Sequence, residues 1–307
     1  MKLSELYKRK EFVITSEVGP VKGCMRPEDE NTPACLAEAT LLQNRVHAIN
    51  VTDNQSAVMR LGSLAASVAL KREGLEPIYQ LTCRDRNRIA LQSSLLNTYS
   101  FGIDNVLCLT GDHTSLGDHK SAKAVFDIDS VQLLKIARGM NAGHDMMGNA
   151  LTQPTDLCLG AVVNPNFDPL DLQLMKMEKK IEAGAEFFQT QAVYDPKLFE
   201  TFMRKTEGFG VPIQYGIVIV KSPQMGKFMN GNVSGITVPD WIIDEMGSVA
   251  KADRRQKAVE ITTLLVKEIA PMVQGVHFMP LGWSDVVAQV IEEIKASGGD
   301  LAHAVGA

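Results

Sequence analysis

Residues Phe12–Gly19 read FVITSEVG, an apolar and β-branched run that ends in a glutamate, a valine and a glycine. β-Branched and aromatic residues favour strands, and a nearly continuous apolar run is typical of a strand covered on both faces. We therefore predict a buried strand here, with Glu17 on it or just beyond it.

Seven further runs of this kind follow along the chain. They are His47–Asp53 (HAINVTD), Pro77–Cys83 (PIYQLTC), Asn105–Gly111 (NVLCLTG), Leu157–Val163 (LCLGAVV), Glu186–Ala192 (EFFQTQA), Pro212–Val220 (PIQYGIVIV) and Gly275–Leu281 (GVHFMPL). Segments with helical periodicity separate them. Eight strands joined by helices imply a parallel sheet, because parallel neighbours need crossover connections.

The helical segments have apolar stripes at the spacing of one helix face. In Leu170–Gly184 the stripe ends at Gly184, which we predict as the C-cap, and in Ser284–Gly298 we predict Ser284 as the N-cap. The stripe residues are Leu174, Met177 and Ile181 in the first segment, Val287, Val290, Ile291 and Ile294 in the second, and Ile261, Leu264, Leu265 and Ile269 before the last strand.

A closed barrel fits these elements better than an open doubly wound sheet. An open sheet would normally show a GxGxxG turn after its first strand, whereas this chain has Glu17-Val18-Gly19-Pro20. The 307 residues also fit the length of one α/β barrel. The predicted fold class is α/β, a single (β/α)₈ TIM barrel, with residues 1–307 as one domain.

Composition narrows the class of protein. The formal net charge of −5 disfavours a nucleic acid partner, which a basic surface would serve better. The N-terminus MKLSELYKRKEF has no apolar core of a signal peptide, and no apolar run approaches the roughly 20 residues that span a membrane. The five cysteines have no paired spacing, as expected for reduced thiols. We expect a cytoplasmic protein without membrane insertion.

In a barrel of this class the functional side chains lie at the carboxyl ends of the strands. The residues at these positions are Glu17, Thr52, Asp53, Thr82, Thr110, Asp112, Asn164 and Gln191. Two long loops, Val21–Pro33 and His113–Asp127, would lie at the same end. We predict one mouth there that contains carboxylates, amides and hydroxyls.

Two carboxylates at this mouth are candidates for catalysis. Burial would raise the pKa of Glu17 toward the range that a general acid needs, although a structural ion pair with Arg84 or Arg86 is the alternative. Gly111 permits a turn that would point Asp112 across the mouth, although an Asx-turn or helix N-cap is equally compatible with Asp112.

Other residues carry weaker signals. Asp112-His113 and Asp118-His119 resemble metal ligands, but a third clustered ligand is missing, so we expect no metal. The charged turn Arg84–Arg88 either binds an anionic ligand group or pairs with itself. We interpret His277 as a core or mouth residue with satisfied hydrogen bonds. Phe228, in a predicted loop with glycines on both sides, is either a stacking platform or a core residue.

The same motifs resemble those of bacterial methylenetetrahydrofolate reductases, over about residues 12–294. They are ITSEVGP, NVTDN, QLTCRDRN, LTGD, KKIEAGAEFFQTQ, KFMNGNVSGITVPDW and VHFMPL, in this order at successive strand ends. The resemblance implies a flavin-bearing barrel that reduces 5,10-methylenetetrahydrofolate to 5-methyltetrahydrofolate by hydride transfer from N5 of the reduced flavin. It also implies that the domain of residues 1–307 has no C-terminal regulatory domain.

The resemblance also assigns roles to individual residues. Glu17 matches the general acid, and Asp112 matches a carboxylate near flavin and pterin. Gln191 matches the amide that binds the pterin, and Phe228 an aromatic that stacks on the substrate or the nicotinamide. The flavin-contact positions are Thr52, Gln80, Thr82, Thr110, Gly111, Asp112, Asn164, Gln173 and Lys180.

Four of these flavin positions differ from the usual family residues. Gln80 stands in place of His, Thr110 of Arg, Asn164 of Tyr and Gln173 of Asp. FAD is the expected cofactor, with FMN as the alternative. Electrons would come from NAD(P)H directly or from a partner subunit, and we expect an oligomer or a hetero-complex.

Two other function classes remain open at this point. One is a pterin-binding barrel that transfers methyl groups from folate to a corrinoid without flavin. The other is a non-catalytic barrel subunit that docks a partner. The colour of a bound flavin would separate the reductase from both.

Overall fold

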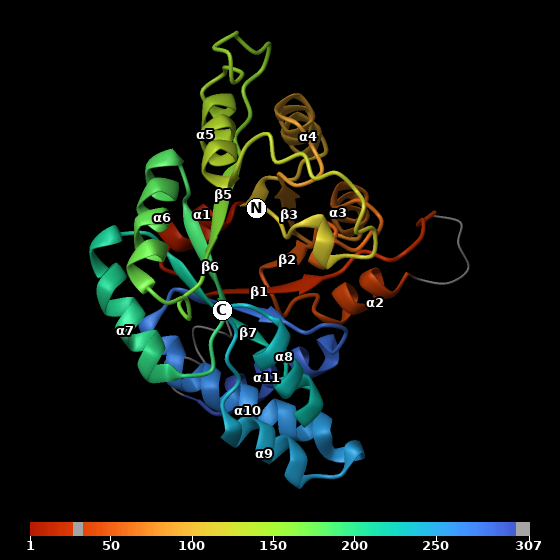
Figure 1. Ribbon diagram of the computed structural model, residues 1–307, viewed down its shortest axis with the longest axis vertical. Helices are drawn as coiled ribbons and strands as arrows, with labels where there is room; N and C mark the ends of the chain where they lie inside the picture. The colour runs from red at the N-terminus through yellow and green to blue at the C-terminus, as the bar shows by residue number, and fades with distance from the viewer. Residues whose placement is uncertain (27–32, 299–307) are drawn as a thin grey trace.

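The computed structural model describes residues 1–26 and 33–298 and shows a closed barrel of eight parallel strands (Figure 1). β1 pairs with β2 on one side and with β8 on the other, so the sheet is closed and the open-sheet alternative is excluded. Each observed strand lies within a predicted run: β1 Val13–Val18, β2 Ala48–Val51, β3 Pro77–Thr82, β4 Asn105–Leu109, β5 Cys158–Val163, β6 Phe187–Ala192, β7 Ile213–Val218 and β8 Gly275–Met279.

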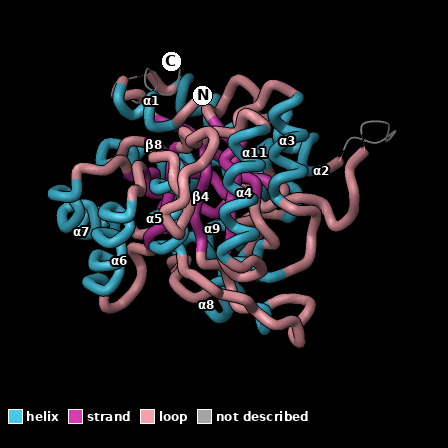
Figure 2. Tube along the Cα trace, turned by 90° about the horizontal axis from the view of Figure 1, so that it is seen from above, coloured by secondary structure: helices cyan, strands magenta, loops and turns pink. Residues whose placement is uncertain are grey.

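Helices form a ring around the strands (Figures 1 and 2). They are α1 Leu3–Lys8, α2 Ala34–Leu41, α3 Ser63–Arg72, α4 Arg88–Ser100, α5 Ser130–Asn141, α6 Leu170–Ala183, α7 Pro196–Thr206, α8 Pro223–Asn232, α9 Asp240–Ser248, α10 Arg254–Ile269 and α11 Ser284–Ala296. Within the described ranges, no helix is long and apolar enough to cross a membrane.

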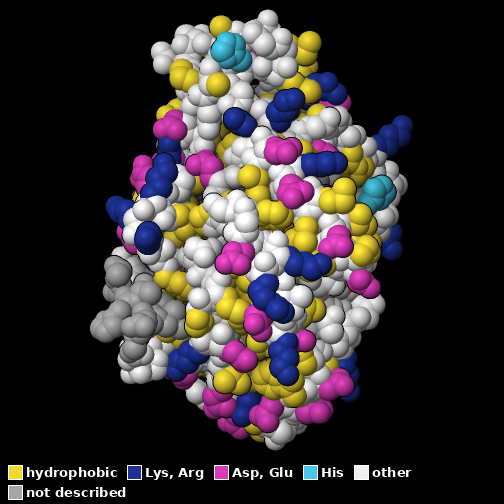
Figure 3. All heavy atoms as spheres, turned by 90° about the vertical axis from the view of Figure 1, so that its left-hand side faces the viewer, with side chains coloured by type: hydrophobic (Ala, Val, Ile, Leu, Met, Phe, Trp, Pro, Cys, Tyr) yellow, Lys and Arg dark blue, Asp and Glu magenta, His cyan; other side chains and the backbone are white. Residues whose placement is uncertain are grey.

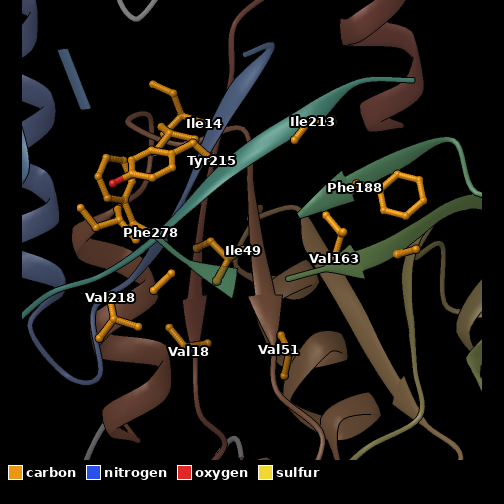
Figure 4. Close-up of a cluster of buried hydrophobic side chains, with 14 of the residues drawn as sticks. Ile14, Val18, Ile49, Val51, Val163, Phe188, Ile213, Tyr215, Val218 and Phe278 are labelled. Atoms are coloured by element: carbon orange, nitrogen blue, oxygen red, sulfur yellow. The ribbon is translucent and has the colours of Figure 1, made fainter. Parts of the chain in front are cut away.

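The main core lies between the strands and the helices. Side chains alternate between the two faces of a strand, so every second residue points outward onto the helices. Figure 4 shows part of this cluster, in which Ile14, Ile49, Phe188 and Phe278 come from four different strands. The hydroxyl of Tyr215 donates to the Val193 carbonyl at 2.7 Å, which satisfies the polar end of a buried ring.

A second apolar cluster closes the amino-terminal end of the barrel. Leu3 and Leu6 of α1 are buried against residues near the starts of the strands, including Val13, Ala48 and Phe187. Figure 2 shows α1 at this end and α8 at the opposite end. Among the described residues, apolar side chains therefore fill this end of the barrel.

Several local predictions need correction. Ser284 is the first residue of α11 and not its N-cap, which is Trp283, and the Ser284 hydroxyl donates to Glu38 at 3.3 Å. Leu264 is 56% exposed, although the rest of its predicted stripe in α10 is buried. Phe228 lies in a helix and not in a loop, since the Ser222 hydroxyl caps α8 and Pro223 begins it.

Other predicted features are confirmed, and one predicted loop includes residues that the structure does not describe. Gly184 caps α6 with a φ of 116°, and Val287, Val290, Ile291 and Ile294 are buried in α11. The thiols of Cys35, Cys83, Cys108 and Cys158 are free and buried. The predicted loop Val21–Pro33 falls partly on residues 27–32, which lie outside the described residues.

A substitution in β5 tests the packing of the lower barrel. A Cβ at Gly160 would lie 2.3 Å from the Phe187 ring, and overpacking of this kind costs about 1–3 kcal/mol. We expect Gly160→Ala to lower the free energy of unfolding by that amount, measured by urea denaturation. Gly208→Ala is the matched control because nothing lies within 4 Å of its Cβ position. Equal stability of the two variants would contradict the packing.

Candidate active site

Two adjoining cavities lie at the carboxyl ends of the strands, with volumes of about 480 and 330 Å³. They share part of their walls, and the shared residues are Glu17, Gln80, Leu109, Thr110, Ser130, Val162 and Lys180. Because one set of residues borders both spaces, we describe them as the larger and smaller parts of one mouth.

Most of the residues that the sequence singled out line this mouth. The larger part is also lined by Asn164, Gln173 and Gln191, and the smaller part by Thr52, Thr82, Gly111 and Asp112. Glu17 and Asp112 therefore border the same space. Phe228 lines neither part and is 60% exposed on α8.

Glu17 lies on the inner face of β1 and is only 7% exposed. One of its carboxylate oxygens, Oε2, is 3.8 Å from Nε2 of His277. The arginines that sequence reasoning offered as partners are engaged with other carboxylates: Arg84 with Asp85 and Arg86 with Asp53. The carboxyl group of Glu17 therefore faces an imidazole and the cavity.

The charged turn after β3 pairs with itself and with its neighbours. Asp53 accepts hydrogen bonds from the Thr82 backbone at 3.0 Å, the Thr82 hydroxyl at 2.9 Å and Arg86 at 2.7 Å. The Arg88 guanidinium forms a bidentate ion pair with the Asp127 carboxylate. These arginines hold the loops, and this arrangement favours the structural interpretation of the turn over the ligand-binding one.

The turn that presents Asp112 needs a glycine. Gly111 has a φ of 89°, and a Cβ there would lie 3.1 Å from the Cβ of Thr82. Arg84 is 2% exposed and donates to the Asp112 carbonyl at 3.3 Å. This hydrogen bond holds the backbone of the turn in place. The Asp112 side chain is exposed and borders the smaller part of the mouth.

Two groups in the mouth are suited to bind a ligand. The hydroxyl of Thr52 is buried and has no hydrogen-bond partner within the described chain, so a bound polar group would satisfy it. Lys180 is also buried, and its Nζ donates to the Val162 carbonyl at 2.6 Å. Burial and the nearby charge of Lys176 lower the pKa of Lys180 to about 8.

The remaining predicted residues are held by local contacts. The Thr110 hydroxyl donates to the Ser130 hydroxyl at 3.2 Å. The Asn164 side chain accepts from the backbone of Asn166 at 3.0 Å. Gln191 lies where the register of β6 and β7 shifts, and its side chain accepts from the backbone of Ala192 at 3.0 Å. Each of them could still bind a ligand through its remaining polar atoms.

A layer of polar side chains lies beneath the mouth, and all of its members except His277 were missed in the sequence. Its members hydrogen-bond to one another inside the barrel and are Thr15, Asn50, Gln189, Gln214 and His277. The available signal was polar residues two positions apart, as in Thr15 and Glu17 or in Gln189 and Gln191. As predicted, His277 is buried with a hydrogen-bonded ring.

Asp118 and His119, in the loop after β4, bind groups of the protein itself. Asp118 accepts from Lys22 at 2.9 Å, from His119 at 2.9 Å and from the backbone of Met59 at 3.1 Å. His119 and Lys22 hold the pKa of Asp118 far below its ordinary value. Within residues 1–26 and 33–298, no three potential metal ligands form a cluster.

The surface shows mixed charge where Figure 3 displays it. Acidic and basic side chains are interspersed on this face, so no continuous basic patch covers it. A surface of this kind does not favour binding along a nucleic acid backbone.

Comparison with known proteins identifies the family to which the chain belongs. The family model described as methylenetetrahydrofolate reductase matches residues 2–295. The chain is 26% identical over 224 residues to methylenetetrahydrofolate reductase 2 of Schizosaccharomyces pombe, which covers 69% of the chain and 34% of that relative. It is 23% identical to 5,10-methylenetetrahydrofolate reductase of Salmonella typhimurium, covering 70% and 69%. The matched part thus spans about a third of the length of the yeast relative.

Solved structures show the same fold at lower identity. A Clostridium thermocellum protein that binds two copies of 5-methyl-5,6,7,8-tetrahydrofolic acid superposes with a TM-score of 0.61 at 15% identity, covering 94% of this chain and 96% of that one. Oxaloacetate acetylhydrolase superposes with a TM-score of 0.54 at 11% identity, covering 99% and 93%. These likenesses concern the barrel alone. The family model, which matches nearly the whole chain, shows that this protein is an enzyme of the methylenetetrahydrofolate reductase family.

Proposed function

We propose that this protein is a flavin-dependent reductase that converts 5,10-methylenetetrahydrofolate to 5-methyltetrahydrofolate. The observation that carries the proposal is that Glu17, 7% exposed, borders the same mouth as Asp112 and the unpartnered hydroxyl of Thr52. The family's reaction requires a proton donor and polar groups that bind flavin and folate. Glu17, Asp112 and Thr52 would supply these groups in one space. The protein that binds 5-methyltetrahydrofolic acid in a similar barrel supports a folate ligand.

The residues of the mouth fit a flavin. Thr52 offers a buried hydroxyl without a partner, and Lys180 and Lys176 supply positive charge for a phosphate. The proposed flavin contacts are Thr52, Gln80, Thr82, Thr110, Gly111, Asp112, Asn164, Gln173 and Lys180. When bound, the reduced flavin would supply the hydride. FAD is our choice, and FMN is the alternative that chromatography of the released cofactor would identify.

The side chains act on the folate by holding it and by moving one proton. We assign to Glu17 the proton that goes to N10, because its buried carboxyl group borders both parts of the mouth. Protonation of N10 breaks its bond to the methylene carbon and leaves an electrophilic iminium at N5, which accepts the hydride. Gln191 would hydrogen-bond the pterin, and Asp112 would act on flavin and pterin from the other side of the mouth.

Two parts of the proposal concern groups outside the mouth. Phe228 is exposed on α8, so its proposed role is to stack on a substrate that extends past the mouth. The electrons would come from NAD(P)H or from a partner subunit in an oligomer or hetero-complex. Purified protein that is colourless and cannot be loaded with flavin would favour the corrinoid methyltransferase alternative.

The acid role of Glu17 predicts a selective defect. We expect Glu17→Gln to bind and reduce flavin normally but to lose at least about a hundredfold in reoxidation of the reduced flavin by methylenetetrahydrofolate, as the loss of a general acid does. Stopped-flow absorbance of the flavin measures both steps. Glu178→Gln, on the exposed face of α6, is the control. Wild-type folate turnover in Glu17→Gln would remove the assignment.

Asp112 is expected to act on both bound groups. Asp112→Asn removes a negative charge beside the proposed flavin site, so we expect a slower folate half-reaction and a changed flavin reduction potential. Redox titration and stopped-flow kinetics measure the two effects. If both quantities stay at their wild-type values, Asp112 does not face the flavin.

Lys180 predicts a pH dependence of stability in the protein without ligand. Its pKa is about 8 in the folded state and 10.5 in the unfolded chain, so the unfolded chain binds more protons between these values. The lysine's contribution to the free energy of unfolding therefore rises with pH from about 8 to 10.5. We expect the difference in unfolding free energy between wild type and Lys180→Met to rise over that range in urea titrations. A constant difference would place Lys180 in water.

A further inference from the structure

The loop after β2 has a strained backbone. Asn54, Ser56 and Ala57 have φ values of 48°, 55° and 57°, which lie in the left-handed region that favours glycine. Asparagine adopts such angles more often than serine or alanine does. Residues in these conformations persist only where surrounding contacts hold them. Residues 54–57, here called the strained segment, must therefore be held by their neighbours.

The strained segment forms one wall of the smaller part of the mouth. Asn54, Gln55 and Ser56 line this space together with Thr52 and Asp112. The buried hydroxyl of Thr52 has no hydrogen-bond partner among the described residues, so we expect a ligand to bind beside this wall. Backbone strain is concentrated at ligand sites, where it fixes a shape before the ligand binds.

The backbone at Gly117, in the loop after β4, lies against the strained segment. A Cβ at this position would lie 1.8 Å from the carbonyl oxygen of Ala57. Gly117 has a φ of −94°, which other residues also adopt, so its own φ does not require glycine. Glycine is needed because the Ala57 carbonyl occupies the place of a side chain.

Asp118, the next residue, binds two other loops. Its Oδ1 accepts from the Met59 backbone at 3.1 Å, and its Oδ2 accepts from Lys22 at 2.9 Å. Met59 follows the strained segment, and Lys22 lies in the loop after β1. One carboxylate therefore connects the loops after β1, β2 and β4.

The start of the strained segment is held separately. The side-chain oxygen of Asn54 accepts from the Arg60 backbone at 3.0 Å, and the Asn54 carbonyl accepts from Arg84 at 3.3 Å. Gly117 and Asp118 therefore act on the end of the segment that contains Ala57, while Asn54 has its own partners.

We propose that Gly117 and Asp118 are positioning residues that hold the strained segment as a preformed wall of the flavin site. This inference rests on the proposed function, in which flavin occupies the smaller part of the mouth. Neither residue is among those that line the mouth, so each acts on the flavin through the segment. A preformed wall favours binding because the loop loses little conformational freedom when the ligand enters.

Flavin affinity tests the role of Gly117. We expect Gly117→Ala to push the Ala57 carbonyl away and to raise the dissociation constant of the flavin that the wild type binds, FAD or FMN, by about tenfold or more. Quenching of flavin fluorescence measures this constant, and circular dichroism checks that the barrel is intact. Gly23→Ala, in the loop after β1, is the matched control because nothing lies within 4 Å of its Cβ position. Equal affinities in the two variants would contradict the proposal.

Two substitutions of Asp118 separate positioning from a loss of bulk. Asp118→Asn keeps an oxygen that can accept from the Met59 backbone, whereas Asp118→Ala removes it. We expect flavin to dissociate from Asp118→Asn within about threefold of the wild-type rate and from Asp118→Ala about tenfold faster. Stopped-flow dilution measures both rates. If the two variants release flavin at the same rate, this hydrogen bond does not hold the wall.

The strain itself can be tested without flavin. Glycine adopts a φ near that of Ala57 at little cost, so we expect Ala57→Gly to raise the urea midpoint of unfolding. An unchanged or lower midpoint would show that the segment is not strained.

Wild-type protein separates this inference from the proposed function. If the wild type binds neither FAD nor FMN, the flavin assignment has failed, and the role of the wall fails with it. If the wild type binds flavin and both Gly117→Ala and Asp118→Ala bind it equally well, the inference is wrong while the reductase proposal stands.

Discussion

The hydrogen bonds between β1 and β8 are the constraint on which the mouth depends. They close the sheet and bring residues from the two ends of the chain into register, with Thr15 opposite His277. Glu17 belongs to the next inward position on β1, so the same pairing places its carboxyl group near the imidazole. Without closure, the carboxyl ends of eight strands would not surround one space.

Inside this closed sheet, the amino-terminal and carboxyl-terminal halves differ in chemistry. The lower half is mostly apolar and is covered by Leu3 and Leu6 of α1, and its buried Asn105 accepts a hydrogen bond from the Leu3 backbone. The upper half contains amides, a hydroxyl and an imidazole, which would be costly to bury if their hydrogen bonds were not satisfied by one another.

Much of the fold and of the site's location could be predicted from the sequence. The eight strands could be recognised because apolar, β-branched runs with helical intervals permit few other folds, and strand ends in such a barrel meet at one face. This reasoning places Glu17, Thr52 and Asp112 around one space, as observed. Their chemical roles remain proposals.

What could not be predicted depends on contacts between distant residues. Arg86 pairs with Asp53 and not with Glu17, and a local pattern cannot distinguish these partners. Ser284 lies one position inside α11, where its hydroxyl donates to Glu38 on another helix. The polar layer was missed because each of its members comes from a different strand, and no single strand shows that these side chains hydrogen-bond to one another. Its meaning appears only when five strands are brought together.

This layer also limits how the sequence can evolve. Because Gln214, Gln189 and Asn50 satisfy one another, replacing any one with an apolar residue leaves a buried partner unpaired, at a cost of about 1–3 kcal/mol. Replacing them together removes that cost, so the effects of the single changes should not add. We expect strong epistasis among these positions, with lineages changing the set jointly or retaining it whole.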